Sequence, residues 1–257
     1  MACGLVLAAC SLALPGCSLD NIPNETCNTD ADCFHAFGAG SVCADAGYCG
    51  PPLECDSDDD CRNRYGFGAF CGDGGTCGYA DLHPGCSVVV PANLPGRFPE
   101  NLAGRIPIGA VFRSSSTQSH AVRLAAARLV VSDINDVEQG IGGTELALIG
   151  CDNSAETADL REQITREQVA FLAHTVGTPA IVGPSASGNS RAALNVIIQG
   201  GYRTVLISPA STASDLIEQA DEIDGFGMFW RTCANDLGQA AILASEISEA
   251  NPTGSVA

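Results

Sequence analysis

The sequence contains no lysine and little positive charge of any kind. Its 12 basic residues are all arginine and stand against 30 aspartates and glutamates, so the net charge is −18 and the isoelectric point lies near 4.3. Alanine and glycine are abundant, which indicates the codon bias of a GC-rich genome as the reason for the missing lysine. A chain this acidic repels phosphate backbones and anionic membrane surfaces. We therefore expect no nucleic-acid partner, and no membrane contact through the protein surface itself.

The apolar stretch at the N-terminus, MACGLVLAACSLALPGC, is too short to span a bilayer as a permanent helix and has the length of a secretory signal. It ends in Leu-Pro-Gly before Cys17, which resembles a bacterial lipobox. Leu-Ala-Ala before Cys10 is a second match, which would leave a very short signal. We predict a signal peptide over 1–16, lipidation of Cys17 and a tether over 17–26. The protein would then be an extracytoplasmic lipoprotein, anchored in the membrane by its lipid alone.

Fourteen cysteines are too many for a reducing compartment and indicate disulfides in a secreted protein. Eight of them form a duplicated module, in which the pattern C-x5-C-x9-C-x5-C recurs 28 residues later: Cys27, Cys33, Cys43 and Cys49, then Cys55, Cys61, Cys71 and Cys77. Each copy can close two disulfides in three ways, and the sequence leaves that choice open. Copies this short cannot bury a core, so the cross-links must hold them.

The module lacks the close C-x2-C pairs of structural zinc sites, which favours disulfides over zinc. Its acidic loops lack the glycine and the distal glutamate of an EF-hand loop, which favours solvated turns over calcium sites. We therefore predict no metal and no cofactor. We place the tandem module at 27–86, with copies at 27–54 and 55–86, and expect it to act as a spacer. A linker with three prolines follows over 87–104 and includes a short strand at Val88–Val90.

From 105 to 257, apolar runs alternate with helical stretches, which predicts an α/β fold with a doubly wound parallel sheet. The runs are IPIGAVF, ELALIGC, AIVG, TVLIS, GMFWRT and a final SVA. In the first helical stretch we expect one stripe to face the core: Val122, Ala126, Leu129, Val130 and Ile134. We also expect Ser154 to cap the second helix, Trp230 to be a core residue and Arg231 to pair with a carboxylate.

Two further cysteines follow the second and fifth of these runs. In a sheet with strand order 2-1-3-4-5, Cys151 and Cys233 would lie at opposite sides and could not pair with each other. We expect one of them to join Cys86, which leaves one thiol free. A catalytic role for the remaining thiol is not expected, because no histidine is placed near it.

Loops rich in serine and threonine follow the first, third and fourth apolar runs, over 113–119, 185–189 and 209–214. Parallel strands bring such loops to one edge of the sheet, where ligands bind in this class of fold. Backbone N–H groups at helix starts and nearby hydroxyls suit a carboxylate or another small anion. The simpler alternative is that Ser187 and Asn189 cap a helix while Ser211, Thr212 and Ser214 shape a turn.

The order IPIGAVF, AIVGPSASGNS, VLISPASTASDL, FWRTCANDLGQAAILASEI over 105–257 resembles the N-terminal lobe of type I periplasmic binding proteins. The branched-chain amino-acid receptors of ABC transporters are the members that it is most similar to. This resemblance implies that Ser187, with Gly188 beside it, holds the ligand carboxylate. It also implies that Ser211 and Thr212 supply a carbonyl and a hydroxyl to the ligand ammonium.

The resemblance further implies a small-molecule ligand such as an amino acid, an ABC permease or a surface receptor as partner, and a second lobe that this chain does not contain. The lobe at 105–257 would then be incomplete. After the first strand, relatives usually carry a glycine-containing loop, whereas this chain has RSSSTQSH, so we include Ser116 among the ligand-binding candidates.

Two other functions are open to consideration. A serine hydrolase would need the motif G-x-S-x-G, and GPSAS around Ser185 lacks the final glycine. All four histidines also precede Ser185, contrary to hydrolase order, so we predict that the protein is not an enzyme. The second alternative is a cell-surface sensor or scaffold lipoprotein whose lobe binds a protein partner or has lost ligand binding through truncation.

Overall fold

A computed structural model describes residues 27–28, 32–33, 42–43, 49–50, 54–92, 98, 102, 104–218, 222–223 and 226–250. The chain divides into two compact units, residues 1–52 and residues 53–257. The predicted signal peptide, Cys17, the tether and the predicted sixth strand near the C-terminus all lie outside the described residues. None of the helices in the described ranges is both long and apolar enough to cross a membrane.

The first unit contains the first cysteine-rich copy. Cys27 pairs with Cys43 and Cys33 pairs with Cys49. Strands β1 (Val42–Cys43) and β2 (Cys49–Gly50) pair antiparallel beside these cross-links. The predicted disulfides are therefore confirmed, and the structure selects one of the three connectivities: first to third and second to fourth.

The second copy repeats this connectivity through Cys55–Cys71 and Cys61–Cys77. It consists of helix α2 and a hairpin: α2 (Asp58–Tyr65), β3 (Ala69–Cys71) and β4 (Cys77–Tyr79). Ser57 begins the helix with a capping box, because its Oγ accepts from the Asp60 backbone N–H while the Asp60 carboxylate accepts from the Ser57 backbone N–H. The copy belongs to the same compact unit as the α/β lobe.

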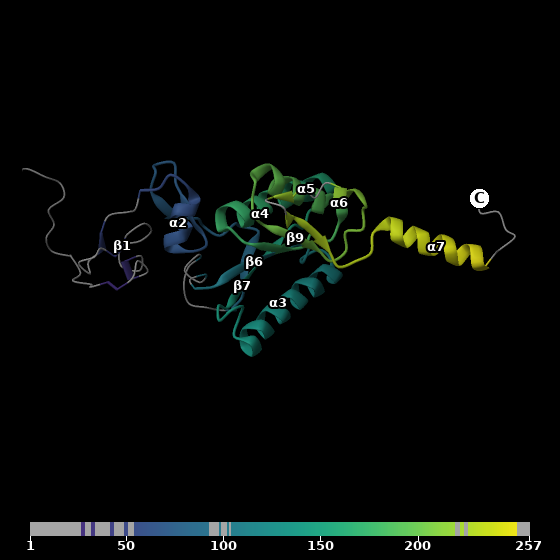
Figure 1. Cartoon of the computed structure of the whole chain (residues 1–257), viewed down its shortest axis with the longest axis horizontal. Coiled ribbons are helices and arrows are strands. Elements are labelled where there is room, and N and C mark those ends of the chain that lie inside the picture. Colours follow the sequence, from purple (N-terminus) through teal and green to yellow (C-terminus); the bar gives the residue numbers. More distant parts are fainter. Residues whose placement is uncertain are drawn as a thin grey trace, which may run out of the picture. The chain divides into compact units, whose positions relative to one another are not determined.

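The lobe is built on a six-stranded sheet with the order β12-β9-β8-β6-β7-β5 (Figure 1). Its strands are β5 (Cys86–Val90), β6 (Ile106–Phe112), β7 (Leu146–Asp152), β8 (Ala180–Val182), β9 (Val205–Ser208) and β12 (Phe229–Arg231). The five strands from β6 onward are parallel and follow the order 2-1-3-4-5. The predicted fold class, a doubly wound parallel α/β sheet preceded by a disulfide-rich module, is confirmed.

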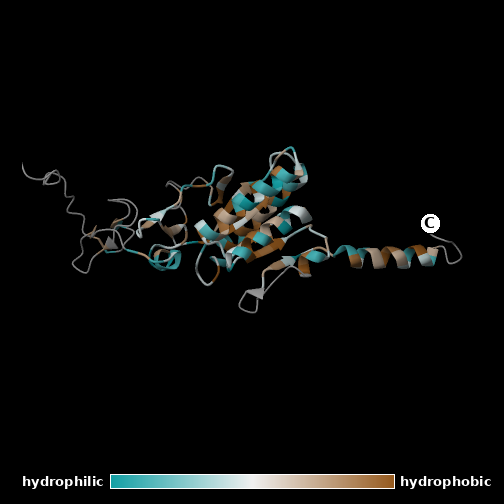
Figure 2. Ribbon diagram, turned by 90° about the horizontal axis from the view of Figure 1, so that it is seen from above, coloured by the Kyte–Doolittle hydropathy of each residue, from teal (hydrophilic) through white to brown (hydrophobic). Residues whose placement is uncertain are grey.

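Helices cover both faces of the sheet, as crossover connections between parallel strands require (Figure 1). The helical segments of the lobe are α3 (Gln118–Glu138), α4 (Ala158–Ala170), the π-helical η3 (Phe171–Val176), α5 (Ser187–Gly200), α6 (Asp215–Glu218) and α7 (Asp236–Ala250). The larger core lies between the sheet and α4, η3, α5 and α6, and the smaller core lies under α3. The strands between the helices are mainly hydrophobic (Figure 2). A two-stranded hairpin, β10 (Glu222–Ile223) and β11 (Phe226–Gly227), precedes β12.

The predicted core stripe of the first long helix is right at Ile134, which packs on the smaller core, and wrong elsewhere. Val122, Leu129 and Val130 are more than half exposed and Ala126 is exposed, whereas the other residues of α3 that pack on the sheet are Leu124, Ala127 and Val131. Both stripes have helical spacing, so periodicity alone could not choose between them. The helix therefore presents a second apolar flank away from its own core.

Trp230 is also not a core residue, because 62% of its surface is exposed. Alternation along β12 turns Phe229 into the larger core and Trp230 to the opposite face of the sheet. On that face α3 packs mainly on β5, β6 and β7, which leaves the end of the sheet at β12 open.

The predicted strand at Val88–Val90 is part of β5, which pairs antiparallel with β7 at the edge of the sheet. Cys86 and Cys151 face each other in this pairing and form a disulfide. Cys233 is the free thiol among the described cysteines. The expectation that one of the two lobe cysteines joins Cys86 is confirmed, and the β7 cysteine is the one that does so.

Candidate functional site

The candidate site lies at the carboxyl ends of the parallel strands, where the loops 113–117, 183–186, 209–214 and 232–235 begin; we call this edge the rim. Gly183 makes the sharp turn after β8 possible. Its φ is +96°, and a Cβ there would come within 2.3 Å of the Val111 carbonyl oxygen, so only glycine fits. The chain then continues through Pro184 and Ser185 into α5.

Helix α5 begins without a side-chain cap. Its N-cap residue is Ala186, which has no side chain that can accept a hydrogen bond from the first turn. Ser185, just before it, is only 8% exposed, and its Oγ has no hydrogen-bond partner among the described residues. Unused backbone donors and an unused buried hydroxyl therefore lie together at the start of this helix.

Three fully buried serines connect the β8–α5 loop to the β9–α6 loop. The Ser211 Oγ lies 2.7 Å from the Ser190 Oγ and 2.8 Å from the Ser208 Oγ, and the Pro184 carbonyl accepts from Ser208 at 2.6 Å and from Ser190 at 3.0 Å. Because this network uses the hydroxyl of Ser211, that side chain holds the two loops in register.

The hydroxyl of Ser187 also connects these loops. Its Oγ accepts from the Ala213 backbone N–H at 3.3 Å, so the hydroxyl proton remains available to donate. Thr212 is half-buried, and no hydrogen bond to another described residue engages its hydroxyl. Gly188 follows in the first turn of α5, where a Cβ would come within 2.7 Å of the Glu162 Oε1. Ser187 and Gly188 thus lie at the start of α5, and Ser211 and Thr212 lie in the adjoining 209–214 turn.

Ser116 makes no hydrogen bond with these four residues in the described structure. It is exposed in the turn between β6 and α3, next to Ser115. The Ser115 backbone N–H donates to the Asp152 carboxylate at 3.2 Å. Ligand binding by Ser116 and by the four residues above stays a prediction.

Arg231 is the residue of this site that sequence reasoning placed wrongly. Instead of a carboxylate, its guanidinium Nη1 contacts two backbone carbonyls, those of Ser211 at 3.2 Å and Ala213 at 2.9 Å. The position of Arg231 at the end of β12, next to the end of β9, could have indicated this contact, because strand order places it beside the 209–214 turn. The turn is therefore held by a permanent cation.

Two titratable groups flank the turn between β6 and α3. Burial lowers the pKa of His120, and the positive charges of Arg123 and Arg113 lower it further, so the imidazole stays neutral at neutral pH. Burial alone would raise the pKa of Asp152, but hydrogen bonds from Ser115 and Ser154 outweigh it and the pKa is lowered.

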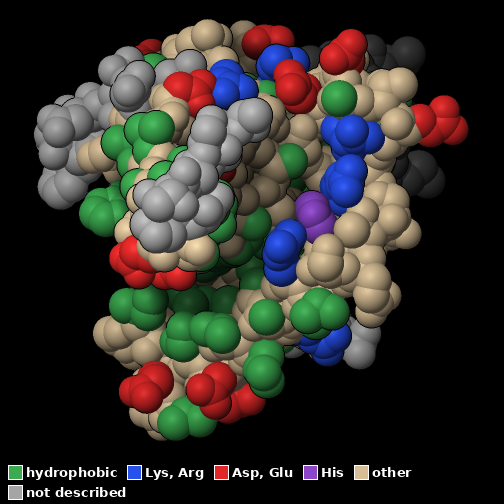
Figure 3. Space-filling model, turned by 90° about the vertical axis from the view of Figure 1, so that its right-hand side faces the viewer, with side chains coloured by type: hydrophobic (Ala, Val, Ile, Leu, Met, Phe, Trp, Pro, Cys, Tyr) green, Lys and Arg blue, Asp and Glu red, His purple; other side chains and the backbone are tan. Residues whose placement is uncertain are grey.

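On the side of the molecule from which α7 extends, the surface carries a row of arginines with one histidine among them (Figure 3).

The cap predicted for the second helix lies three residues later than expected. Ser154 donates from its hydroxyl and its backbone N–H to the Asp152 carboxylate, at 2.6 and 3.0 Å, and so orders the loop after β7. Helix α4 begins at Ala158, and the Thr157 Oγ1 caps it by accepting from the Leu160 backbone N–H at 3.2 Å.

The three described histidines do not form a base for a serine nucleophile. The Nδ1 of His120 accepts from the Arg113 backbone N–H at 3.3 Å, and the Nδ1 of His83 accepts from the Gly85 backbone N–H at 3.1 Å. The Nε2 of His174 lies 3.1 Å from the Asp58 carboxylate. None of these contacts joins an imidazole to Ser185 or Ser187 in the described structure.

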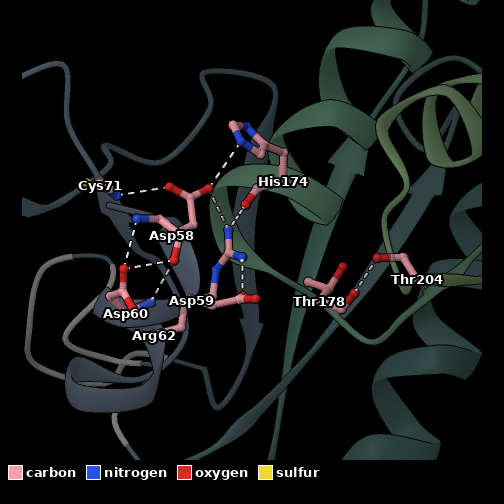
Figure 4. Close-up of polar contacts among 9 residues, drawn as sticks. Asp58, Asp59, Asp60, Arg62, Cys71, His174, Thr178 and Thr204 are labelled. Carbon is pink, nitrogen blue, oxygen red and sulfur yellow. Dashed lines mark hydrogen bonds and ion pairs between the residues drawn. The ribbon is translucent and has the colours of Figure 1, made fainter. Parts of the chain in front are cut away.

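A hollow of about 510 Å³ lies at the ends of the strands opposite the rim, where residues of the second cysteine-rich copy meet residues that precede β8 and β9. Asp58 lies 3.2 Å from the Arg62 Nη2, and Arg62 also donates to the His174 carbonyl (Figure 4). The Gly68 backbone N–H donates to the Val176 carbonyl at 3.0 Å. The sequence alone did not indicate this docking. Arg62 is engaged through its terminal nitrogens, while its buried Nε has no hydrogen-bond partner among the described residues.

No protein-family model matches the chain, and no curated protein matches its sequence. Solved structures do resemble it. The branched-chain amino acid transporter substrate-binding protein LivJ from Streptococcus pneumoniae, in complex with isoleucine, is 27% identical, with 56% of this chain and 38% of that chain covered and a TM-score of 0.46. An ABC transporter substrate-binding protein from Desulfitobacterium hafniense, in complex with Leu, is 27% identical, with 56% and 39% covered and a TM-score of 0.47.

A solute-binding protein of an ABC transporter from R. palustris, in complex with 4-hydroxybenzoate, is 12% identical, with 57% of this chain and 36% of that chain covered and a TM-score of 0.44. The first of the three is a substrate-binding protein of a branched-chain amino acid transporter, the class to which the sequence motifs are similar. This chain spans less than two fifths of the length of each of them.

Proposed function

We propose that the lobe binds a small ligand through a carboxylate at the start of α5, as one half of an extracytoplasmic solute-binding protein for ABC transport. Recognition rather than reaction is the function that the rim supports. The uncapped first turn of α5, with the unused buried hydroxyl of Ser185 before it, is the observation that carries the proposal. A carboxylate accepts several hydrogen bonds at once and is stabilised at the positive end of a helix.

Ser187 is the residue that we expect to contact the carboxylate directly. Its Oγ accepts a hydrogen bond from the 209–214 turn. The hydroxyl proton donates to no other described residue, so it can be donated to an anion. A hydrogen bond to a charged acceptor contributes about 1.5–3 kcal/mol, which corresponds to roughly a tenfold change in affinity or more.

The test is Ser187→Ala, titrated calorimetrically with whichever acid a thermal-shift screen of small carboxylic and amino acids identifies. We expect about a tenfold weaker affinity. Ser245→Ala, a serine on the exposed surface of α7, is the matched control and should bind as the unmodified protein does. An unchanged affinity in Ser187→Ala would exclude this residue as a ligand contact.

The rest of the proposal concerns location and partners. We propose that Cys17 carries a lipid that anchors the protein outside the cytoplasm, and that an ABC permease receives its ligand. Release of the protein from membranes by Cys17→Ser, followed by fractionation, tests the anchor.

A second candidate, a surface sensor or scaffold that binds a protein partner, is favoured by large apolar side chains that the described structure leaves exposed: Val122, Leu129, Val130, Trp230, Leu237, Ile242 and Leu243. The absence of any thermal shift across the acid library, together with capture of a defined partner that is lost in Leu129→Asp, would favour this candidate.

A further inference from the structure

Helix α3 carries an apolar stripe on the side that faces away from the sheet. Its residues recur at helical spacing, with one acidic residue in line with them, and we call them the outer stripe: Val122, Ala126, Leu129, Val130 and Val137. Between 56% and 70% of the surface of each of the four larger residues is exposed. Single apolar residues at a surface need no explanation, but a continuous stripe indicates a contact surface.

The opposite side of α3 is fixed on the sheet, so the outer stripe cannot turn inward. Leu124, Ala127 and Val131 pack in the smaller core. The side-chain amide of Asn135 donates to the Leu146 carbonyl at 2.9 Å and accepts from the Leu146 backbone N–H at 2.7 Å. None of the other described helices and strands of the lobe lies on the outer side of α3 (Figure 1). A partner for the outer stripe must therefore come from outside the lobe.

The charges of α3 are separated into two halves. The first half carries Arg123 and Arg128 and no acidic residue, whereas the second half carries Asp133, Asp136 and Glu138 and no basic residue. Two such helices side by side in the same direction would place like charges opposite each other, which is unfavourable. The antiparallel arrangement places unlike charges opposite each other. One helix thus contains both parts of a complementary surface, as a two-fold interface between identical chains requires.

The apolar residues and the charges are arranged about the same centre. An antiparallel pair with its two-fold axis at Leu129–Val130 places Val122 of one copy level with Val137 of the other. The same axis places Arg123 of one copy level with Asp136 of the other. The stripe and the charge pattern therefore predict the same register.

We propose that the outer stripe is the interface of a homodimer, in which the α3 helices of two copies pack antiparallel about a two-fold axis at Leu129 and Val130. The 21 residues of α3 span about 32 Å at 1.5 Å per residue. One helix pair of this length forms a small interface, below about 1,200 Å² in total, so the dissociation constant lies in the micromolar range. A lipid surface fits the stripe less well, because the chain has a net charge of −18.

Sedimentation velocity of the full chain over a series of concentrations tests the dimer. We expect a reversible change from monomer to dimer in the micromolar range. Leu129→Asp should weaken the dimer at least tenfold, because it places two carboxylates together at the axis. Leu237→Asp is the matched control, since Leu237 on α7 is 67% exposed and Leu129 is 70% exposed, and it should leave the dimer unchanged. A monomer at every concentration, or a dimer that Leu129→Asp does not weaken, overturns the proposal.

Charge reversal tests the antiparallel direction. Arg123→Glu with Arg128→Glu makes both halves of the helix acidic, so the dimer should weaken severalfold. In a parallel pair the same replacement would only exchange one like-charge contact for another. Adding Asp133→Arg and Asp136→Arg inverts the pattern and should restore the dimer, because the inverted helix is again complementary to itself. A fourfold variant that keeps its circular dichroism but stays monomeric overturns the antiparallel arrangement.

Cysteine cross-linking tests the position of the axis. Residues near a two-fold axis lie close to their own counterparts, so Val130→Cys should form a covalent dimer on mild oxidation. Val122→Cys is the control, because Val122 lies near the end of the pair, level with Val137 of the other copy. Cys233→Ser is included in both variants, and the chain with that change alone gives the background. Cross-linking of Val122→Cys as rapid as that of Val130→Cys overturns the proposed register.

Discussion

The two cysteine-rich copies share one disulfide connectivity but belong to different compact units of the chain. In each copy the first cysteine pairs with the third and the second with the fourth. In each copy an aspartate also accepts a backbone N–H four residues before it: Asn28 donates to Asp32 at 2.9 Å, and Asp56 donates to Asp60 at 3.1 Å. The repeated pattern therefore reproduces both the cross-links and the turn that precedes the second cysteine.

The copies differ in the residue that follows the second cysteine. In the second copy this residue is Arg62, which contacts Asp58 and the carbonyl of His174 in η3. In the first copy the equivalent residue, 28 positions earlier, is Phe34, which has no hydrogen-bond donor in its side chain. The second copy lies in the compact unit of the lobe, whereas the first lies in the other unit. The disulfide pattern is thus common to both copies, whereas the arginine that contacts η3 in the second copy has no counterpart in the sequence of the first.

Removing one disulfide should affect the stability of the lobe very differently in the two copies, and this is the largest difference that we expect. We expect the double replacement Cys61→Ser and Cys77→Ser to lower the free energy of unfolding of the lobe by about 2–4 kcal/mol, because it loosens the helix that docks on η3. Urea unfolding followed by circular dichroism at 222 nm measures the effect. The same replacement at Cys33 and Cys49 is the control and should leave the midpoint of the lobe unchanged. Equal losses from both pairs would show that the copies do not differ in docking.

The fold of the lobe could be predicted from the sequence, because its strands are separate apolar runs with loops at one edge. The disulfide from Cys86 to a lobe cysteine was expected for a sheet with the order 2-1-3-4-5, and the structure has that order. The face of α3 that packs on the sheet could not be predicted, because the helix carries apolar residues on two sides and only its contact with the sheet determines which side is buried. The exposure of Trp230 depends on which strands α3 covers, which no local pattern contains.

The loops of the candidate site could be predicted from the sequence, but not their contacts. Strand order brought 185–189 and 209–214 to one edge of the sheet, and the family resemblance singled out Ser187, Ser211 and Thr212 within them. The buried hydrogen bonds of Ser211 and the contact of Arg231 with two carbonyls depend on distances between strands that are far apart in the sequence. The choice among three disulfide connectivities was open for the same reason.

Arg62→Phe gives the second copy the residue of the first. It removes hydrogen bonds from a partly buried guanidinium to a carboxylate and a carbonyl, so we expect a loss of about 1–2 kcal/mol in the free energy of unfolding of the lobe. Asp59→Ala is the control in the same ion-pair group. Its side chain is 86% exposed and lies 3.6 Å from Arg62, so its loss should stay within about 0.5 kcal/mol. A loss in Arg62→Phe no greater than in this control would mean that docking does not depend on the guanidinium.

Acidification should produce the smallest difference in stability between the two copies. Both copies carry an aspartate that accepts a backbone N–H, and low pH protonates it in each. The pKa of Asp60 lies below its ordinary value of 3.8, since the Ser57 side chain and the backbone N–H groups of Asp56 and Ser57 stabilise its carboxylate. Because the folded pKa is the lower one, the cap contributes fully above pH 3.8 and is lost as the pH falls through the folded value. A carbon-detected NMR titration of the Asp60 carboxyl measures this, and a midpoint at or above 3.8 would contradict it. Asp60→Asn should weaken α2 slightly at neutral pH and remove this part of the acid response, while Asp32→Asn in the first copy should leave the acid unfolding of the lobe unchanged.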